Sequence, residues 1–482
     1  MKLPAIVGSL LIFIVGSITH AQGPADPDKM SPEEYVTRQV ANGEPADFEN
    51  RAQKELSSFF IIRLLTNADN SFKIHQHLVM IKHAVIRDEI NLLNEEIPND
   101  IALTNCIFEN AVNFTQSHFA RSLNLADSTF KKKADFENAV IEFDFNIDDC
   151  HFDFRNSADP DDDAGYFKSL RIGRDWSMLG AQFTSHADFT ESNIGGKLLA
   201  TKANFGSGAE FGSVRVNGES LLRETSFSDG EASFADTHFS NLFLNDAHFE
   251  KTSLMDFTRM EVESVFLDNV RYPESGQVRI EGMTFKSMSP ASWDGLQDLR
   301  NHCEYDPEFY TNLETLYRSH GHTNQADQVF IEKQRHDRSA LCPSLFRDCQ
   351  RGKWTFSLLE DWLTGYGRSL QNLLLWSIGF VVFGSWAFRR SGMKRSGGNE
   401  EDDPGKPYKL RHWRLRRWLN GLYGGFWYSL DLFLPIIELG EREKWEPRDN
   451  RRWAVFYKRV HAIIGHLFVP IGLAAWTGII KY

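Results

Sequence analysis

Four ionisable side chains lie in or beside apolar stretches near the C-terminal end of the sequence: Asp431, Glu438, His461 and His466. Ionisable groups in such surroundings are costly, so they are candidates for moving ions or protons in a membrane. Asp431 and Glu438 are seven residues apart, about two helical turns, and would share one helix face. We therefore predict a polar membrane site here, with Asp431 as its first candidate. The alternative places all four at a water-exposed boundary beside neighbouring arginines.

Five cysteines complete the side chains that could do chemistry. Cys342 and Cys349 are the candidate disulfide in an oxidising compartment, and pairing of one of them with Cys303 is the alternative. Cys106 and Cys150 each precede an apolar position of a repeat, so they are expected to fill the core.

The sequence lacks the motifs that usually carry catalysis or cofactor binding. It has no Cys-x-x-Cys pair, no Gly-rich dinucleotide loop after a strand and no plausible pair of haem ligands. Its histidines lack metal-ligand spacing. We predict no catalytic residue, no metal and no cofactor, which favours a non-enzyme and leaves an enzyme as an open alternative.

Composition and charge divide the chain into two environments. The 482 residues are 41% hydrophobic and 25% charged, with a mean hydropathy of −0.39, which excludes a polytopic transporter. The net charge of −13 argues against nucleic acid as a partner. Residues 81–285 have 18 Lys+Arg against 35 Asp+Glu, whereas residues 347–482 have 22 against 13. An acidic body in water and a basic tail at an anionic membrane fit this division.

The N-terminus has the pattern of a secretion signal. Lys2 precedes an apolar run over residues 3–18, and Thr19-His20-Ala21 provides small residues for cleavage. We predict a signal peptide over residues 1–21, with an uncleaved anchor as the alternative. Residues 22–80 are expected to form a loose leader up to residue 50 and then an amphipathic helix that caps the following domain.

Two apolar ladders with an eleven-residue period occupy the middle of the chain. One starts at Ile81 and the other at Ile86, and both resume after an Asp-rich insertion at 159–163 as far as residue 227. After Phe234 the step becomes five and leads to Leu254. Offsets of five and six residues cannot share one helical face, which excludes a helical coiled coil. Short strands with inward large and small side chains fit instead. Four strands make a coil of about 22 residues, so residues 81–289 predict a β-solenoid of about nine coils.

This pattern resembles the pentapeptide-repeat family. The matches are Ala134-Asp135-Phe136, Ala187-Asp188-Phe189 and Ala203-Asn204-Phe205. The resemblance implies a mainly β fold, a right-handed quadrilateral β-solenoid, and says almost nothing about function because a solenoid is a surface and not a chemistry.

The remaining chain predicts helices. Residues 290–350 contain a helical hairpin, expected to act as a collar that closes the solenoid. Residues 351–482 predict a membrane domain with spans near 370–388 and 460–480. Ten Lys+Arg in 389–420 and seven in 440–459 place both flanks of 421–439 in the cytoplasm, so this segment is re-entrant or, alternatively, a third span.

The tail resembles the pore module of two-helix potassium channels, with Tyr428-Ser429-Leu430-Asp431 similar to the end of a pore helix. The following residues lack the filter glycines. Thr364-Gly365-Tyr366-Gly367 precedes the first span and is therefore interpreted as a turn. As a whole, the chain resembles a bacterial group of pentapeptide-repeat membrane proteins, for which ion-channel-like and oxidoreductase functions are implied; the sequence has no redox motif.

These observations favour a membrane-anchored β-solenoid that presents a binding or scaffolding surface without catalysis. The alternative is an oligomeric ion-channel-like protein with a pore segment at 421–440 of a non-potassium type. The expected partners are the lipid bilayer, an envelope protein or further copies of the chain, and no nucleic acid. The expected location is the bacterial inner membrane, with the solenoid outside the cytoplasm.

Overall fold

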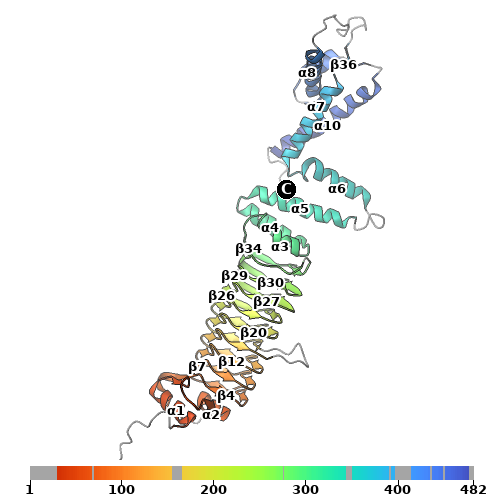
Figure 1. Cartoon of the computed structure of the whole chain (residues 1–482). Coiled ribbons are helices and arrows are strands. Elements are labelled where there is room, and N and C mark those ends of the chain that lie inside the picture. The colour runs from red at the N-terminus through yellow and green to blue at the C-terminus, as the bar shows by residue number, and fades with distance from the viewer. Residues whose placement is uncertain are drawn as a thin grey trace, which may run out of the picture. The chain divides into compact units, whose positions relative to one another are not determined.

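The computed structural model describes residues 30–67, 70–154, 165–274, 276–342, 350–389, 392–396, 414–434, 437–448 and 451–476. The chain forms two compact units, Met1–Asp306 and Pro307–Tyr482 (Figure 1). The predicted signal peptide and the Asp-rich insertion lie outside the described residues.

Two helices precede the solenoid. Helix α1 (Pro32–Asn42) begins with a capping box between Ser31 and Glu34, and α2 (Ser58–Thr66) buries four apolar side chains. Helix α2 is the expected amphipathic helix, and it packs against strands β5 and β6 of an early coil. The expectation of a loose leader up to residue 50 is wrong for residues 32–47. Helix α1 occupies most of that stretch, and Ala46 and Asp47 pair with Ile81 and Lys82 as part of a first coil.

The solenoid strands stack in four columns, each strand parallel to the next. The first column contains β1 (Ala46–Asp47), β3 (Leu78–Lys82), β7 (Asp100–Thr104), β11 (Leu123–Asn124), β15 (Phe145–Asn146), β19 (Trp176–Ser177) and β23 (Leu198–Leu199). A 3-10 turn, η2 (His75–His77), precedes β3. The second contains β2 (Glu55–Leu56), β4 (Val85–Ile86), β8 (Ile107–Phe108), β12 (Thr129–Phe130), β16 (His151–Phe152), β20 (Gln182–Phe183), β24 (Asn204–Phe205), β27 (Ser226–Ser228) and β30 (His248–Lys251).

The third column contains β5 (Ile90–Asn91), β9 (Val112–Asn113), β13 (Ala134–Asp135), β17 (Gly165–Tyr166), β21 (Ala187–Asp188), β25 (Ala209–Glu210), β28 (Glu231–Ser233), β31 (Leu254–Asp256) and β33 (Val278–Arg279). The fourth contains β6 (Glu96–Ile97), β10 (His118–Phe119), β14 (Val140–Ile141), β18 (Arg171–Ile172) and β22 (Asn193–Ile194). It continues in longer strands, of which the first also pairs with the first column: β26 (Arg215–Leu221), β29 (His238–Phe243), β32 (Glu261–Phe266) and β34 (Thr284–Ser289).

The predicted ladders form the core of the solenoid. Phe152, Phe183 and Phe205 are buried, and their rings stack in successive coils with centroids 4.6 and 5.3 Å apart. Prediction and structure differ at Leu254, which is only half-buried; Met255 and Phe257 are buried instead. The reason is one extra residue in β30: Ser226 pairs with His248, 22 residues on, but Ser228 pairs with Lys251, 23 residues on, so the five-residue count loses the register after Phe249.

Asn and Asp side chains shape the corners of the coils. Asn105, Asp127 and Asn138 have positive φ values of 55–59°, a conformation that Asn and Asp tolerate better than most residues. At other corners a side-chain oxygen accepts a hydrogen bond from the N–H two residues later, as Asn113 does from Thr115. The polar residues between the ladders therefore determine where the chain turns.

Residues 290–306 cover the last coil. Helix α3 (Gln297–His302) leads into Cys303, which forms a β-bridge with Val278, and Glu304 N–H donates to the Val278 carbonyl. Trp293, Leu296 and Leu299 are the buried apolar side chains of this segment. These residues belong to the first unit, so the predicted collar divides at Asp306.

The second unit is helical. It contains the predicted hairpin, α4 (Pro307–Ser319) and α5 (Thr323–Ala340), followed by α6 (Arg351–Thr364), α7 (Leu370–Ala387), α8 (Arg414–Phe433), α9 (Glu441–Lys444) and α10 (Arg452–Trp476), with the short antiparallel pair β35 (Met393–Arg395) and β36 (Trp445–Pro447). Helices α7, α8 and α10 pack against one another and are called the three-helix bundle below. Among the described residues, no helix combines the length and the apolar character that a membrane crossing requires.

The segment between the two predicted spans enters the bundle and returns. Helix α8 runs antiparallel to α7, because Ser385 Oγ donates to the Leu422 carbonyl and Ser429 Oγ donates to the Val381 carbonyl. After α8 the chain turns back, and Ser396 N–H donates to the Lys444 carbonyl beside the β35–β36 pair. The return therefore ends at the same end of the bundle as the C-terminus of α7.

Candidate functional site

Glycines allow the three helices to approach closely. A Cβ atom at Gly384 of α7 would collide with the Ser429 hydroxyl, and one at Gly465 of α10 would collide with the Phe433 carbonyl. A Cβ atom at Gly425 of α8 would likewise collide with the carbonyl of Ser385. Small residues at helix contacts are typical of helices that pack by close backbone approach.

A buried polar cluster lies between the three helices. His461 and Ser429 are both 0% exposed. The His461 Nε2 atom is 3.1 Å from both the hydroxyl and the carbonyl oxygen of Ser429, and its Nδ1 atom is 3.1 Å from the Tyr457 hydroxyl. A carbonyl oxygen can only accept, so the proton belongs on Nε2, and Nδ1 accepts from Tyr457. The neutral imidazole is therefore fully hydrogen-bonded.

Asp431 fixes the turn that follows α8. Its carboxylate is buried and accepts hydrogen bonds from the N–H groups of Leu439, at 2.9 Å, and Arg442, at 2.7 Å. These bonds tie the returning segment to the last turn of α8. Asp431 thus acts as a buried acceptor for backbone donors.

Glu438 and His466 lie outside this buried cluster. Glu438 is exposed and pairs with Arg442 at 2.9 Å, beyond the end of α8, so the expected helix face shared with Asp431 does not exist. His466 is exposed and its Nδ1 atom is 2.7 Å from the Ala462 carbonyl of its own helix. Of the four residues singled out from the sequence, the bundle buries only Asp431 and His461.

A second polar network connects α5 to α6 and to the turn before α7. Asp361 pairs with Arg335 at 2.9 Å and with Arg338 at 2.8 Å, and the Arg338 guanidinium also donates to the Tyr366 hydroxyl. Burial alone would raise the pKa of Asp361, but the hydrogen bonds and charges of the two arginines hold it below its ordinary value. Thr364-Gly365-Tyr366-Gly367 is the predicted turn, with positive φ at its last three residues.

Among the described cysteines, the structure shows buried thiols in the solenoid core and one disulfide-bonded cysteine after the hairpin. Cys106 and Cys150 are buried thiols in the solenoid core, and burial raises the pKa of Cys106 to about 12. Cys342 is disulfide-bonded, and Cys303 is not part of a disulfide. Cys349 lies outside the described residues, so its pairing with Cys342 stays a prediction.

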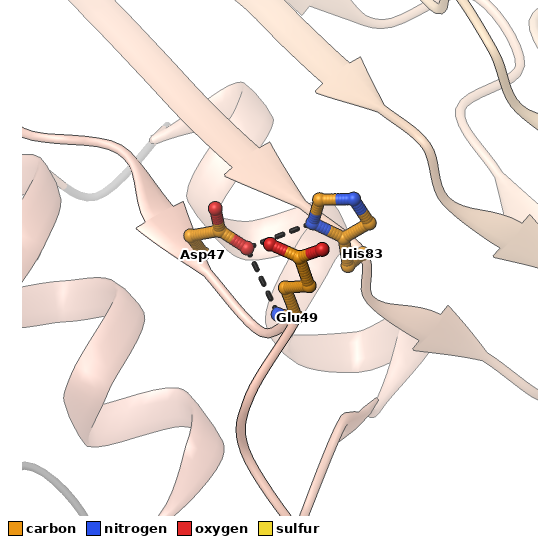
Figure 2. A group of neighbouring side chains, drawn as sticks. All are labelled: Asp47, Glu49 and His83. Carbon is orange, nitrogen blue, oxygen red and sulfur yellow. Dashed lines mark hydrogen bonds and ion pairs between the residues drawn. The ribbon is translucent and has the colours of Figure 1, made fainter.

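A cluster in the first coils was missed by the sequence analysis. Asp47, Glu49 and His83 place one ligand atom each within 4.8 Å of one another (Figure 2). The Asp47 carboxylate accepts from Glu49 N–H at 2.9 Å and lies 2.8 Å from His83 Nδ1. Burial tends to raise the pKa of Asp47, but these hydrogen bonds lower it overall. The group has the oxygen and nitrogen atoms that a divalent cation needs, although a cation would first displace the proton shared by Asp47 and His83.

The fold and these clusters define the class of the protein as a parallel β-solenoid repeat protein with an appended helical unit. Neither the protein-family models nor the curated proteins compared with this sequence match it. The resemblance to pentapeptide repeats therefore rests on the coil itself, namely its length, its four strands and its stacked phenylalanines.

Proposed function

We propose that this chain is a membrane-anchored β-solenoid, held in the bacterial inner membrane by its three-helix bundle, and that the solenoid presents a non-catalytic binding surface outside the cytoplasm. The observation that carries the proposal is that the bundle buries polar and ionisable side chains beside an apolar cluster of Leu373, Val381, Phe433 and Phe468, and exposes large apolar side chains. Ser429, Asp431 and His461 are completely buried. Many exposed side chains on α7 and α10 are instead large and apolar, among them Leu375, Ile378, Val382, Phe456, Ile463 and Leu467.

Water disfavours such a surface, because soluble monomers rarely expose large contiguous apolar patches. A lipid environment favours it, and the close glycine contacts and hydroxyl-to-carbonyl hydrogen bonds between helices are those used in membranes. The polarity of the solenoid suits water instead, because its apolar ladders are buried.

Two further observations support the orientation. The β35–β36 pair joins the basic segment after α7 to the segment before α10, so Arg389, Arg395 and Arg451 gather at one end of the bundle. Positive residues flanking membrane helices favour the cytoplasmic side. The disulfide at Cys342 lies in the chain before α7 and favours an oxidising compartment there.

The ion-channel alternative receives less support. A pore that uses Asp431 needs its carboxylate to face water, whereas here the carboxylate is buried and bonded to two backbone N–H groups. Glu438 is exposed but pairs with Arg442. A surface for binding is therefore the better proposal.

Membrane fractionation of cells that produce the full chain tests the anchor. We expect the protein to stay in the membrane pellet after alkaline carbonate extraction. The double substitution Ile378→Glu and Val382→Glu should release a large fraction, whereas Leu179→Glu, at an exposed leucine of the solenoid, should not. Full release of the unsubstituted chain by carbonate would refute anchoring.

Cysteine labelling in intact cells tests the orientation. In a Cys303→Ser background, an impermeant maleimide should label Asn204→Cys in the solenoid and should leave Ser396→Cys unlabelled until the cells are opened. Labelling of Ser396→Cys alone would place the solenoid in the cytoplasm and would contradict the proposal.

A further inference from the structure

The fourth column of strands carries a run of outward-facing side chains whose charges change along the solenoid. In coil order, these residues are Glu96, His118, Val140, Arg171, Asn193, Arg215, His238, Glu261 and Thr284. Both histidines have a carboxylate partner: His118 Nδ1 lies 2.7 Å from Glu96, and His238 lies 3.2 Å from Glu261. The middle of the run differs from both ends.

Arg171 and Arg215 have no such partner. Within the described part of the chain, neither guanidinium takes part in a hydrogen bond, an ion pair or a cation–π contact. The register explains this, because Arg171 lies between Val140 and Asn193, and Arg215 between Asn193 and His238. No carboxylate stacks directly above or below either arginine.

Most other basic side chains of the solenoid do find a carboxylate in an adjacent coil. Lys131 reaches Glu109 at 2.9 Å, Lys197 reaches Glu219 at 2.8 Å, and Arg259 reaches Asp236 at 2.6 Å. These pairs neutralise positive charge on a domain with 35 acidic residues between positions 81 and 285. Arg171 and Arg215 therefore differ from these paired residues, because no contact within the described part of the chain engages their guanidinium groups.

The two arginines line one hollow of about 430 Å³ on the solenoid surface. Asn193 lies between them, and Ser169, Glu191 and Ser213 line the hollow from the adjoining corner. The Ser169 hydroxyl donates to Glu191 at 2.8 Å, which leaves further carboxylate lone pairs to accept from a ligand. The hollow thus offers two fixed positive charges together with neutral hydrogen-bonding groups and one acceptor.

Two glycines follow the outward-facing residues of the fourth column on the side away from the hollow's corner residues. Gly173 and Gly195 follow the outward residues Arg171 and Asn193 by two positions, and a Cβ at either glycine would collide with a backbone carbonyl of the preceding coil. The packing of the coils therefore demands glycine at these two positions, and neither position places a side chain beside Arg171 or Asn193.

We infer that the Arg171–Asn193–Arg215 hollow binds a segment of an acidic polysaccharide. The guanidiniums are two coils apart, about 10 Å from the coil spacing, and would each bind a carboxylate of the sugar chain. Asn193, Ser213 and Glu191 would bind its hydroxyl groups. A polyanion with a charge on every unit, such as nucleic acid, fits less well because Glu191 and the acidic solenoid repel it.

This inference names a partner class for the proposed binding surface and rests on that proposal only for its location outside the cytoplasm. Binding is measured with the purified full chain in detergent, so it stands or falls independently of the fractionation and labelling experiments above. The probe is a fluorescein-labelled hyaluronan octasaccharide, in which every second sugar has a carboxylate, and the readout is fluorescence anisotropy. A neutral dextran oligosaccharide and a double-stranded DNA of similar length serve as competitors.

We expect saturable binding that hyaluronan competes for and that dextran and DNA do not. The double variant Arg171→Gln and Arg215→Gln should lose about tenfold or more in affinity, since two charge-assisted bidentate contacts are removed. The control Lys202→Gln and Lys286→Gln removes the same charge from exposed sites outside the hollow and should change affinity less than about twofold. Glu191→Gln should change the affinity for the hyaluronan octasaccharide without changing the free energy of unfolding.

Three outcomes would overturn the inference. The first is absence of saturable binding to the unsubstituted chain. The second is an equal loss in the control double variant, which would mean general attraction to positive charge. The third is tighter binding of DNA than of hyaluronan. Because the arginines are exposed and unpaired within the described residues, the double variant should unfold like the unsubstituted chain, which excludes misfolding as the cause of any loss.

Discussion

The solenoid and the three-helix bundle both bury apolar side chains, but the bundle also completely buries an aspartate and a histidine and exposes many large apolar side chains. In the solenoid, most residues with no exposure are aliphatic or aromatic, and most charged residues lie outside, many of them in pairs. In the bundle, Ser429, Asp431 and His461 have no exposure, and leucine, isoleucine and phenylalanine side chains lie outside. The same chemical rule applies to both, because most buried polar groups are hydrogen-bonded, with exceptions such as the Ser220 hydroxyl in the solenoid and the Tyr428 hydroxyl in the bundle. The difference therefore concerns the solvent that each unit is built to meet.

The solenoid and the bundle are also stabilised in different ways. The solenoid uses long-range stacking, in which every coil supports the next through parallel strands and rings. The bundle uses close backbone approach at glycines and a few hydrogen bonds between helices. Substitutions of matched chemistry in the two units should thus have costs of different size and origin.

The largest expected effect is a break in the phenylalanine ladder. Phe183→Ala removes a ring that stacks on Phe152 at 4.6 Å and on Phe205 at 5.3 Å. We expect a loss of about 3–5 kcal/mol in the free energy of unfolding, since the rigid coils above and below cannot collapse into the cavity. Urea denaturation followed by circular dichroism measures it.

Phe143→Ala is the matched control because Phe143 lies on the solenoid surface, 42% exposed. It should cost less than about 1 kcal/mol, as surface substitutions usually do. Equal losses at the two positions would contradict the view that stacked rings hold the coils together.

The next effect addresses the buried carboxylate of the bundle. Asp431→Ala leaves the N–H groups of Leu439 and Arg442 without their acceptor. Unsatisfied buried donors cost about 1–3 kcal/mol each, so we expect a loss of about 2–3 kcal/mol after relaxation of the turn. Thermal unfolding in detergent measures this loss.

Glu438→Ala removes the other carboxylate of the same segment, which is exposed and pairs with Arg442. The cost should stay below about 1 kcal/mol, as for exposed ion pairs in general. A larger loss at Glu438 than at Asp431 would show that the turn is held by the ion pair and not by the buried acceptor.

The sequence predicted the solenoid well because its signal is repeated in every coil. The apolar residue at each eleventh position is buried even where it is as small as Ala200. The prediction failed at Leu254 because the count assumed a constant coil length. It also failed at Glu438, because the seven-residue spacing implied a helix that ends at Phe433.

The sites were harder to predict because their members are brought together by coil stacking. Asp47 and His83 are 36 residues apart, and Asp47 lies in a coil that the ladders did not reach. Arg171, Asn193 and Arg215 are spaced by 22 residues, so an alignment of coils would have found their column. Their lack of carboxylate partners depends on side-chain positions and needed the structure.

A smaller effect tests the hydrogen bonds between helices. Ser429→Ala removes the donation to the Val381 carbonyl of α7, while the Ser429 carbonyl stays in place for His461. We expect a loss of about 1 kcal/mol, the usual size for hydroxyl contacts between packed membrane helices. Ser377→Ala is the control, because that hydroxyl bonds only within its own helix, to the Leu373 carbonyl. Thermal unfolding in detergent should show a lower midpoint for Ser429→Ala alone.

The smallest effect concerns charge on the outside of the solenoid. His118 lies between two carboxylates, with Glu142 at 3.0 Å and Glu96 at 2.7 Å. The hydrogen bond to Glu142 raises the pKa of His118 most, burial opposes it, and Glu96 raises it further. A raised folded-state pKa means that the stabilisation is complete below the unfolded value of about 6.5 and is lost as the pH rises through the folded value.

The stabilisation should remain below about 1 kcal/mol, because solvent screens these exposed groups. His118→Gln should therefore lower the urea midpoint at acidic pH and leave it nearly unchanged at pH 9. His151→Gln, in the second column of strands, should show no such pH dependence, since the structure gives its ring no carboxylate partner among the described residues. A pH-independent loss at His118 would mean that the ring stabilises the coil by packing, and the paired ends of the column would then differ from its unpaired middle in shape instead of charge.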